Sequence, residues 1–379
     1  MTNRSTSGLI VATSAGAPMR SVRPKPIHLL CGRAMASYVL DTLGAAGVRQ
    51  AVVVTGADGG RVSKRLLEDP PAFPVRFAEQ SGIAAARGTG DAALIGATSF
   101  DDFDDEEDLV IVPADLPLLR ASTLTQLLDA HRSSGAACTV LTADAADPLL
   151  RPAPNRSVSD RIVRDRHGRV ASIDADDSRL LTEEEQDPDD ITEVSLGVYC
   201  VRRGLLAPAL RRSVAESLEG TVRLSDIVEV LTGSGHACET AMIDHPGDLI
   251  PVNDRLQLAE AEAELRRRTN RHWMSAGVTM IDPERTYIDV TVRLGTDITI
   301  FPGTILQGAT TIGSGCELGP DTRLDRCQVG NNTRIEKTTG SLATIGDDCV
   351  VGPFAVLEPG SDIADGTTTG PFYAGGTST

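Results

Sequence analysis

A six-residue repeat in the last third of the chain constrains its fold most strongly. Bulky aliphatic residues recur every six positions at Leu294, Ile300, Leu306, Ile312, Leu318 and Leu324. The repeat resumes in a new phase at Val329 and Ile335 and, after a short insertion, continues at Ile345, Val351, Leu357 and Ile363. This period predicts a left-handed parallel β-helix whose aliphatics point into a triangular core, with about 18 residues per coil. Because such prisms commonly associate in threes, we expect a homotrimer through the β-helix.

The first two-thirds of the chain alternates short apolar runs with amphipathic stretches. Buried strands are expected at residues 9–13, 51–55, 109–113 and 138–141, and a helix at residues 35–43. Strands that alternate with helices predict an α/β fold with a parallel sheet covered on both faces. Ligands of such sheets lie beyond the carboxyl ends of the strands. We therefore look for a site around Gly16, Gly56 and Asp115.

The two regions are joined by a long polar segment, Leu256–Ser275, which is predicted to be a helix. Its apolar spacing is helical, and an arginine run lies toward its carboxyl end, where cations suit the helix dipole. We divide the chain into residues 1–254, a connector helix at residues 255–277 and a β-helix at residues 278–379. Two domains suit a length of 379 residues.

Composition excludes several classes of partner. The net charge is −17, from 53 acidic against 36 basic residues, whereas nucleic acids and anionic membranes require a basic face. A local group of arginines could still hold a small phosphorylated ligand.

The chain shows neither a signal sequence nor an apolar run of about 18 residues. Seven cysteines without a CxxC pair indicate a reducing compartment, so we expect a cytoplasmic protein. Two acidic runs, residues 101–108 and 174–190, are predicted to be solvated loops.

Four segments could carry chemistry. The loop after the first strand, Ser14-Ala15-Gly16, exposes backbone N–H groups that could cradle phosphate, with Arg20 and Lys25 as counter-charges, although an ordinary turn is the alternative. The segment 87–92 is either a second such loop or a turn that opens a helix. Asp115 stands at the end of a buried strand, where a carboxylate caps a helix or binds a cation. Asn253 or Asp254 either caps the connector helix or has a functional role.

Together these segments resemble a known bacterial family, the bifunctional N-acetylglucosamine-1-phosphate uridylyltransferase/glucosamine-1-phosphate acetyltransferases. The resemblance rests on order and spacing over nearly the whole chain, and most specifically on Arg87-Gly-Thr-Gly-Asp-Ala92, Ala114-Asp-Leu-Pro-Leu118, Val252-Asn-Asp-Arg-Leu-Gln-Leu258 and the β-helix. It implies a Rossmann-like nucleotidyltransferase domain of the GT-A type followed by a short left-handed parallel β-helix.

The resemblance also implies roles for individual residues. Asp115 and Asn253 would coordinate Mg²⁺. Arg20 and Lys25 would be catalytic residues that hold the triphosphate. The nucleotide contacts would come from Thr13, Ser14, Ala15, Gly16, Gly88, Thr89, Ala114 and Asp115. The expected partners are a nucleoside triphosphate and a sugar or cyclitol 1-phosphate, joined with release of pyrophosphate.

Several positions depart from the family pattern. Pro18 replaces the second glycine of the phosphate loop and donates no N–H. The family's sugar contacts fall here at Asp160, Ala175 and Ser195, beside Asn253, so we expect an acceptor other than N-acetylglucosamine 1-phosphate. Gln80 lies outside the spacing of the family's base-contacting glutamine. A non-catalytic regulatory or assembly subunit is the alternative reading.

A further departure concerns the acetyltransferase half. Glu358 stands where the family has an arginine, and the chain ends before the coils that carry the family's catalytic histidine. We therefore expect no acetyl transfer.

Overall fold

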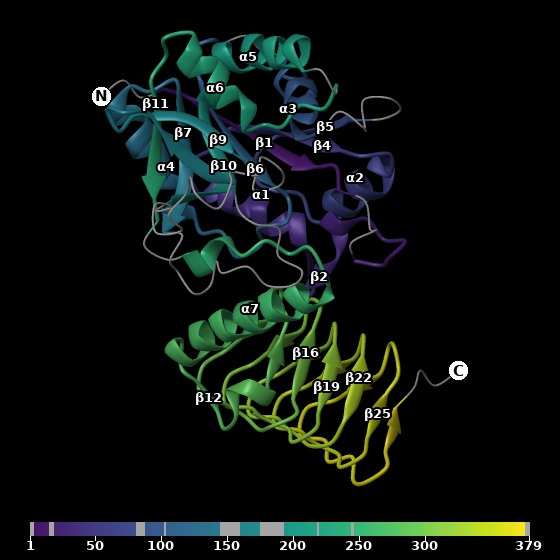
Figure 1. The fold of residues 1–379 in the computed structure, drawn as a ribbon. Coiled ribbons are helices and arrows are strands. Elements are labelled where there is room, and N and C mark those ends of the chain that lie inside the picture. Colours follow the sequence, from purple (N-terminus) through teal and green to yellow (C-terminus); the bar gives the residue numbers. More distant parts are fainter. Residues whose placement is uncertain are drawn as a thin grey trace. The chain divides into compact units, whose positions relative to one another are not determined.

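A computed structural model describes residues 4–14, 19–80, 88–101, 104–144, 160–174, 193–217, 220–243 and 246–375 (Figure 1). The chain forms two compact units. One comprises Met1–His28 with Ala34–Leu258, and the other Leu29–Arg33 with Ala259–Thr379.

The first unit is built on a nine-stranded sheet with the central order β11-β7-β10-β6-β1-β4-β5. Its strands are β1 (Thr6–Ala12), β4 (Gln50–Thr55), β5 (Val75–Glu79), β6 (Asp108–Pro113), β7 (Cys138–Asp144), β8 (Arg161–Arg164), β9 (Val170–Asp174), β10 (Glu193–Arg202) and β11 (Cys238–Met242). The predicted strands β1, β4 and β6 pair in parallel, as expected. The pairs β4–β5 and β7–β11 are also parallel, although β5 and β11 were not among the predicted strands.

The prediction of a wholly parallel sheet is wrong at β10. This strand runs antiparallel to both of its neighbours, β6 and β7. A parallel pair needs a crossover connection, usually a helix, and none of the described residues between β7 and β10 is helical. The antiparallel hairpin β8–β9 lies there instead, and β8 pairs with β10.

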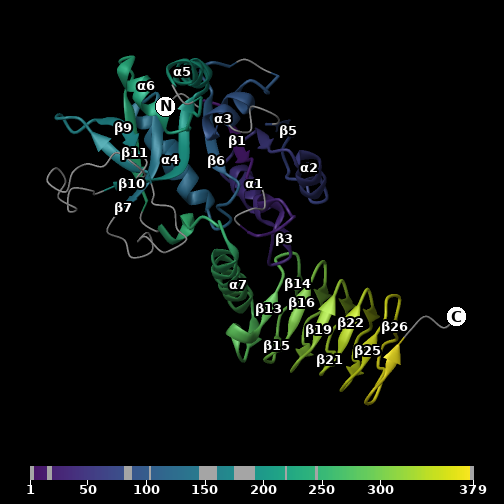
Figure 2. The ribbon, with the colours of Figure 1, turned by 45° about the vertical axis from the view of Figure 1, so that its right-hand side comes forward.

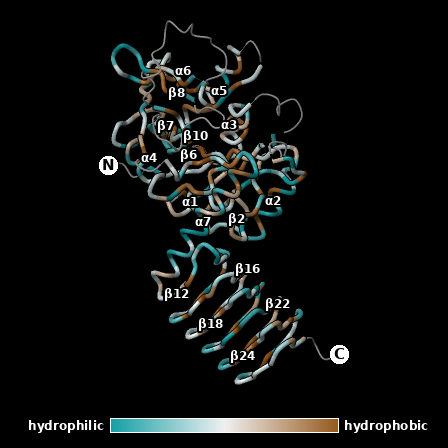
Figure 3. The backbone as a smooth tube through the Cα atoms, turned by 60° about the horizontal axis from the view of Figure 1, so that its bottom comes forward, coloured by the Kyte–Doolittle hydropathy of each residue, from teal (hydrophilic) through white to brown (hydrophobic). Residues whose placement is uncertain are grey.

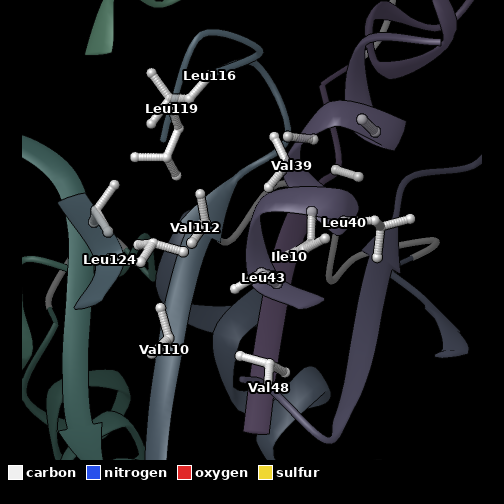
Figure 4. Packing of buried hydrophobic residues seen from close by; sticks show 14 of the residues in the cluster. Ile10, Val39, Leu40, Leu43, Val48, Val110, Val112, Leu116, Leu119 and Leu124 are labelled. Atoms are coloured by element: carbon white, nitrogen blue, oxygen red, sulfur yellow. The ribbon is translucent and has the colours of Figure 1, made fainter. Parts of the chain in front are cut away.

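Helices cover both faces of this sheet (Figures 1 and 2). They are α1 (Met35–Ala45), α2 (Gly59–Leu67), α3 (Thr89–Ala97), α4 (Ala121–Ser134), α5 (Arg203–Glu216) and α6 (Asp226–Gly233), with short 3₁₀ helices η1 (Lys25–Ile27) and η5 (Pro246–Leu249). Successive residues of a strand point to opposite faces. Ile10 accordingly joins the core beneath α1 and α4, as Figure 4 shows, whereas Leu9 joins the core beneath α3, α5 and α6.

The second unit contains most of helix α7 (Arg255–Ser275) and the left-handed parallel β-helix that the repeat predicts. Three parallel sheets, with the orders β12-β15-β18-β21-β24, β13-β16-β19-β22-β25-β27 and β14-β17-β20-β23-β26, form its sides. Their strands are β12 (Val278–Met280), β13 (Tyr287–Ile288), β14 (Arg293–Leu294), β15 (Ile298–Ile300), β16 (Ile305–Gln307), β17 (Thr311–Ile312), β18 (Glu317–Leu318), β19 (Arg323–Asp325), β20 (Gln328–Val329), β21 (Arg334–Ile335), β22 (Thr339–Ser341), β23 (Thr344–Ile345), β24 (Val350–Val351), β25 (Val356–Leu357), β26 (Asp362–Ile363) and β27 (Ala374–Gly375). A 3₁₀ helix, η6 (Pro283–Arg285), precedes β13, and the short strands β2 (Leu29–Leu30) and β3 (Arg33–Ala34) pair with each other.

The aliphatic repeat supplies the interior of the β-helix, and Figure 3 shows hydrophobic segments recurring from coil to coil. Leu294 is half-buried and every other predicted inward position is buried. The prediction of an insertion before Ile345 is wrong. Strand β22 occupies that stretch as part of a regular coil and pairs in register with β19. Its inward residue is Gly340, where an added Cβ would lie 3.1 Å from Leu324 Cδ2. A glycine at an inward position is invisible to a count of aliphatic residues.

The prediction of a solvated loop fails at the end of the first acidic run. Glu107 and Asp108 are buried, with exposed fractions of 1% and 0%. Glu107 accepts a hydrogen bond from Ser7 and pairs with Arg203 at 2.7 Å, and Asp108 pairs with Arg132 at 2.7 Å. Buried carboxylates require such partners. The second acidic run lies outside the described residues beyond Asp174.

The seven cysteines are all free and buried. Among the described helices, none is both long and apolar enough to cross a membrane.

Candidate active site

The site predicted at the carboxyl ends of β1 and β6 is built on two adjacent parallel strands. Val11 pairs with Pro113, and the N–H of Ala114 donates to the carbonyl of Val11 at 3.0 Å. Asp115 therefore emerges directly beyond the edge of the sheet. Ala114, whose side chain is buried, lies with Asp115 in the lining of a small hollow that also includes Val11, Ala12, Ser14, Lys25, Pro26 and Met35.

Lys25 approaches this edge as the first residue of η1, the short 3₁₀ helix Lys25–Ile27. Its neighbours Pro24 and Pro26 restrict the backbone on both sides. Lys25 is only 4% exposed. A buried ammonium group is costly unless charged or polar acceptors surround it.

Asn253 reaches the same place from a distant part of the sequence. The N–H of Val252 donates to the carbonyl of Asp115 at 2.9 Å, and the N–H of Asn253 donates to Oε1 of buried Gln257 at 2.7 Å. Asp254 Oδ1 accepts from the N–H of Gln257 at 2.9 Å and so caps α7. Of the two candidates, Asp254 is the helix cap, and the side chain of Asn253 is available to the site.

Three side chains meet at one point. The ammonium nitrogen of Lys25 donates to Oδ2 of Asp115 at 2.5 Å and to Oδ1 of Asn253 at 2.9 Å. Asp115 and Asn253 thus direct oxygen atoms at one shared cation. Sequence separations of 90 and 228 residues are bridged by these two contacts.

This donor set suits a divalent cation. A carboxylate oxygen and an amide oxygen are hard ligands of the kind that Mg²⁺ prefers, and the lysine ammonium already stands where a cation is attracted. Among the described residues, no three His, Cys, Asp or Glu side chains come together as a further metal site. The protein would supply two ligands, and water and substrate oxygens would complete the shell, as is usual for Mg²⁺.

The phosphate-loop residues are only partly described. Thr13 is half-buried and Ser14 is exposed, whereas Ala15, Gly16 and Pro18 lie outside the described residues. Arg20 is exposed, has a φ of 48° and has no partner among the described residues. The adjacent carbonyl of Met19 accepts from Nε of Arg255 at 3.2 Å.

The second predicted loop opens helix α3. Gly88 has a φ of 86°, and an added Cβ would lie 2.6 Å from the carbonyl oxygen of Val222. Thr89 Oγ1 accepts from the N–H of Leu224 at 3.0 Å, so this side chain fixes the loop to residues 222–224. Gln80, which the spacing argument set aside, donates to the carbonyl of Gly88 at 3.1 Å. It directly follows β5, a strand that the sequence reading did not identify.

The predicted acceptor residues Asp160 and Ser195 are neighbours. The N–H of Ser195 donates to the carbonyl of Asp160 at 2.7 Å, beside an irregularity in the pairing of β10 with β7. Burial raises the pKa of the Asp160 carboxyl, and the nearby positive charge of Arg223 opposes that rise. Arg223, which sequence reasoning missed, also pairs with Asp226 at 3.2 Å. Ala175 lies outside the described residues.

Comparison of the sequence with known proteins shows the family to which the chain belongs. Residues 8–229 match the model of the MobA-like NTP transferase domain. The chain is 37% identical to the bifunctional protein GlmU of Carboxydothermus hydrogenoformans, over 96% of this chain and 76% of that protein. The GlmU proteins of Mycolicibacterium vanbaalenii and Heliobacterium modesticaldum are 38% and 35% identical, each over 97% of this chain and over 72% and 75% of their own lengths.

The chain belongs to the GlmU family. It is an enzyme with a nucleotidyltransferase domain, and membership of the GlmU family supports nucleotidyl transfer to a sugar 1-phosphate.

Proposed function

We propose that the protein catalyses Mg²⁺-dependent nucleotidylyl transfer from a nucleoside triphosphate to a sugar or cyclitol 1-phosphate, giving an NDP-sugar and pyrophosphate. The observation that supports it best is the convergence of Lys25, Asp115 and Asn253 at the carboxyl ends of β1 and β6. This is where ligands bind in open α/β sheets.

The reaction itself explains why so few groups suffice. An oxygen of the acceptor phosphate forms a bond to the α-phosphorus, and the bond from that phosphorus to the bridging oxygen of pyrophosphate breaks. The nucleophile is already an anion, so no proton must be removed. The site must instead offset repulsion between phosphates and hold them in line.

The proposed roles follow from the charges. Asp115 and Asn253 would hold the divalent cation, which when bound would neutralise phosphate oxygens. Lys25, positioned by η1, would place a positive charge against the phosphates, and the exposed side chain of Arg20 would add a second. Thr13, Ser14, Ala15, Gly16, Gly88, Thr89 and Ala114 remain the proposed contacts of the nucleotide.

Acceptor binding is assigned to Asp160, Ala175, Ser195 and Asn253. The half-buried carboxyl of Asp160 and the hydroxyl of Ser195 supply hydrogen-bonding groups that differ from the family's sugar contacts, which favours a different acceptor. Replacement of the family's arginine by Glu358 supports nucleotidyl transfer without acetyl transfer. We also keep as proposals a cytoplasmic homotrimer and the division into residues 1–254, 255–277 and 278–379.

Pyrophosphate release across a panel of nucleoside triphosphates and sugar or cyclitol 1-phosphates, with Mg²⁺, tests the function. We expect turnover with at least one pair, and loss of that turnover in Asp115→Ala. Absence of turnover with every pair, together with no triphosphate binding by calorimetry, would instead favour a non-catalytic subunit.

A further inference from the structure

We propose that Lys25 and the divalent cation compete for the same two oxygen atoms, so that the lysine ammonium closes the cation site until a metal displaces it. The inference rests on the proposed assignment of Asp115 and Asn253 as cation ligands. It adds a second function to Lys25, beyond the phosphate contact proposed above.

The first ground is the sharing of atoms. Oδ2 of Asp115 and Oδ1 of Asn253 both accept from Nζ of Lys25, at 2.5 and 2.9 Å. Mg²⁺ binds such oxygens at about 2.0–2.1 Å. A divalent cation on both oxygens would crowd the ammonium group, and two positive charges at such separations repel strongly in a poorly hydrated site. Occupation by one cation therefore disfavours the other.

The second ground is burial. Lys25 is 4% exposed and its side chain 5% exposed, so its ammonium group cannot exchange its acceptors for bulk water where it stands. Asp115 and Asn253 are its acceptors in this state. When a metal takes these oxygens, the flexible lysine stem must carry the charge to another anion, and the phosphates of a bound nucleoside triphosphate would supply one. Metal and nucleotide are then expected to bind together more favourably than either alone.

The third ground is the identity of the residue. Only three of the 36 basic residues of the chain are lysines, yet one of them holds this position. An ammonium group is a compact point charge on a flexible stem, whereas a guanidinium is a planar fork suited to bidentate partners. A group that occupies the place of a spherical ion and then leaves it needs the first set of properties.

Metal binding without any nucleotide or acceptor tests the proposal. Mn²⁺ serves as the probe, with the free ion measured by electron paramagnetic resonance on the full-length chain. We expect Lys25→Met, which keeps the side-chain length and removes the charge, to bind Mn²⁺ at least about tenfold more tightly than the unmodified protein. Lys64→Met is the matched control, because Lys64 is exposed on α2 of the same unit and its replacement removes an equal charge elsewhere.

The two possible results are distinct. Tighter Mn²⁺ binding in Lys25→Met, unchanged binding in Lys64→Met, and loss of the gain when Asp115→Asn is added would support competition. Equal or weaker binding in Lys25→Met would overturn it. If Lys25 had a purely structural role, its replacement by Met would weaken metal binding and lower the activity together. Competition instead predicts that Lys25→Met binds the metal more tightly while its activity falls. Tighter binding in a protein that releases no pyrophosphate would retain the competition and reject only the proposed function.

The small number of lysines allows a second measurement that needs no change at the site. Protein labelled with ¹³C at the lysine ε-carbon has three labelled side chains, Lys25, Lys64 and Lys337. Addition of Mg²⁺ is expected to shift the signal of Lys25, assigned by its absence in Lys25→Met, and to leave the other two in place. An unmoved Lys25 signal at Mg²⁺ concentrations that saturate the site would contradict displacement.

Discussion

The backbone N–H of Val252 donates a hydrogen bond to the carbonyl oxygen of Asp115 at 2.9 Å. This contact joins the segment before α7 to the end of β6 and sets Asn253 beside the carboxylate. The bond joins main-chain atoms only, so it leaves the Asp115 carboxylate and the Asn253 amide free to face the proposed cation site. The site is therefore part of the sheet edge and does not depend on a freely moving loop at these two positions.

Gln257 is expected to position Asn253 without touching substrate. Its Oε1 accepts the N–H of Asn253 at 2.7 Å, and the glutamine is 4% exposed. In Gln257→Ala this N–H loses its hydrogen-bond partner, which should lower the free energy of unfolding by about 1–3 kcal/mol. We expect the Mg²⁺ concentration for half-maximal rate to rise by about tenfold, as for other residues that orient a metal ligand.

Gln257→Glu keeps an acceptor oxygen and should retain most of the metal affinity. Gln126→Ala, on the exposed face of α4, serves as the control. An unchanged Mg²⁺ requirement in Gln257→Ala would show that Asn253 is held by other means.

The loop that opens α3 tolerates no side chain at Gly90. An added Cβ there would lie 2.6 Å from Val222 Cγ1 and 2.9 Å from the Val222 carbonyl oxygen. We expect Gly90→Ala to destabilise the first unit by about 1–3 kcal/mol through overpacking. Gly60→Ala is the control, because a Cβ at that position on α2 meets nothing within 4 Å, and it should raise the melting temperature slightly. Equal melting temperatures for the two variants would contradict the packing described here.

Strand β18 offers adjacent inward and outward residues for a test of the β-helix. Leu318 is 0% exposed, whereas Glu317 is exposed and lies 3.7 Å from Arg334. Leu318→Ala should cost about 2–5 kcal/mol through the cavity it leaves. Glu317→Ala should change stability by no more than about 1 kcal/mol, because the ion pair is exposed. Differential scanning calorimetry measures both, and a reversed order of the two effects would exclude the predicted inward register.

Buried His131 is expected to make stability depend on pH. Burial lowers the pKa of its imidazole to about 4, although the negative charge of Asp108 opposes this. Between its ordinary value of 6.5 and about 4, the unfolded chain binds a proton that the folded chain does not. Stability should therefore be complete above pH 6.5 and fall as the pH decreases toward 4. Melting temperatures from pH 7 to 4.5 should fall less steeply in His131→Gln, and parallel curves would rule this contribution out.

The β-helix could be predicted closely because its fold is specified by a local pattern, the six-residue spacing of inward aliphatic residues. Each inward aliphatic, from Ile300 to Ile363, fills a core by its own side chain, so spacing alone indicates its direction. The coil that was misread as an insertion has a glycine, Gly340, at its inward position, so no aliphatic side chain identifies that position in the sequence. The antiparallel β10 escaped prediction because strand direction depends on the connection that precedes it.

The site could be predicted only in part, because its contacts are long-range. Asp115 could be found at the end of an apolar run, but no pattern near it indicates that Lys25 and Asn253 lie against it, and only the family resemblance linked the metal ligands. Glu107 and Asp108 are a similar case. Their partners Ser7, Arg132 and Arg203 lie on other elements. The acidic run alone therefore predicted a solvent-exposed loop.

The central claim is that Asp115 and Asn253 serve one cation in one reaction, and a double-mutant cycle on pyrophosphate release measures this directly. Asp115→Asn, Asn253→Ala and the double variant are compared by kcat/KM at fixed Mg²⁺. If both residues hold the same ion, the second change has little left to remove, and the double variant should be about as slow as the slower single variant. Losses that multiply, so that each residue contributes the same factor whether or not the other is present, would contradict a shared cation.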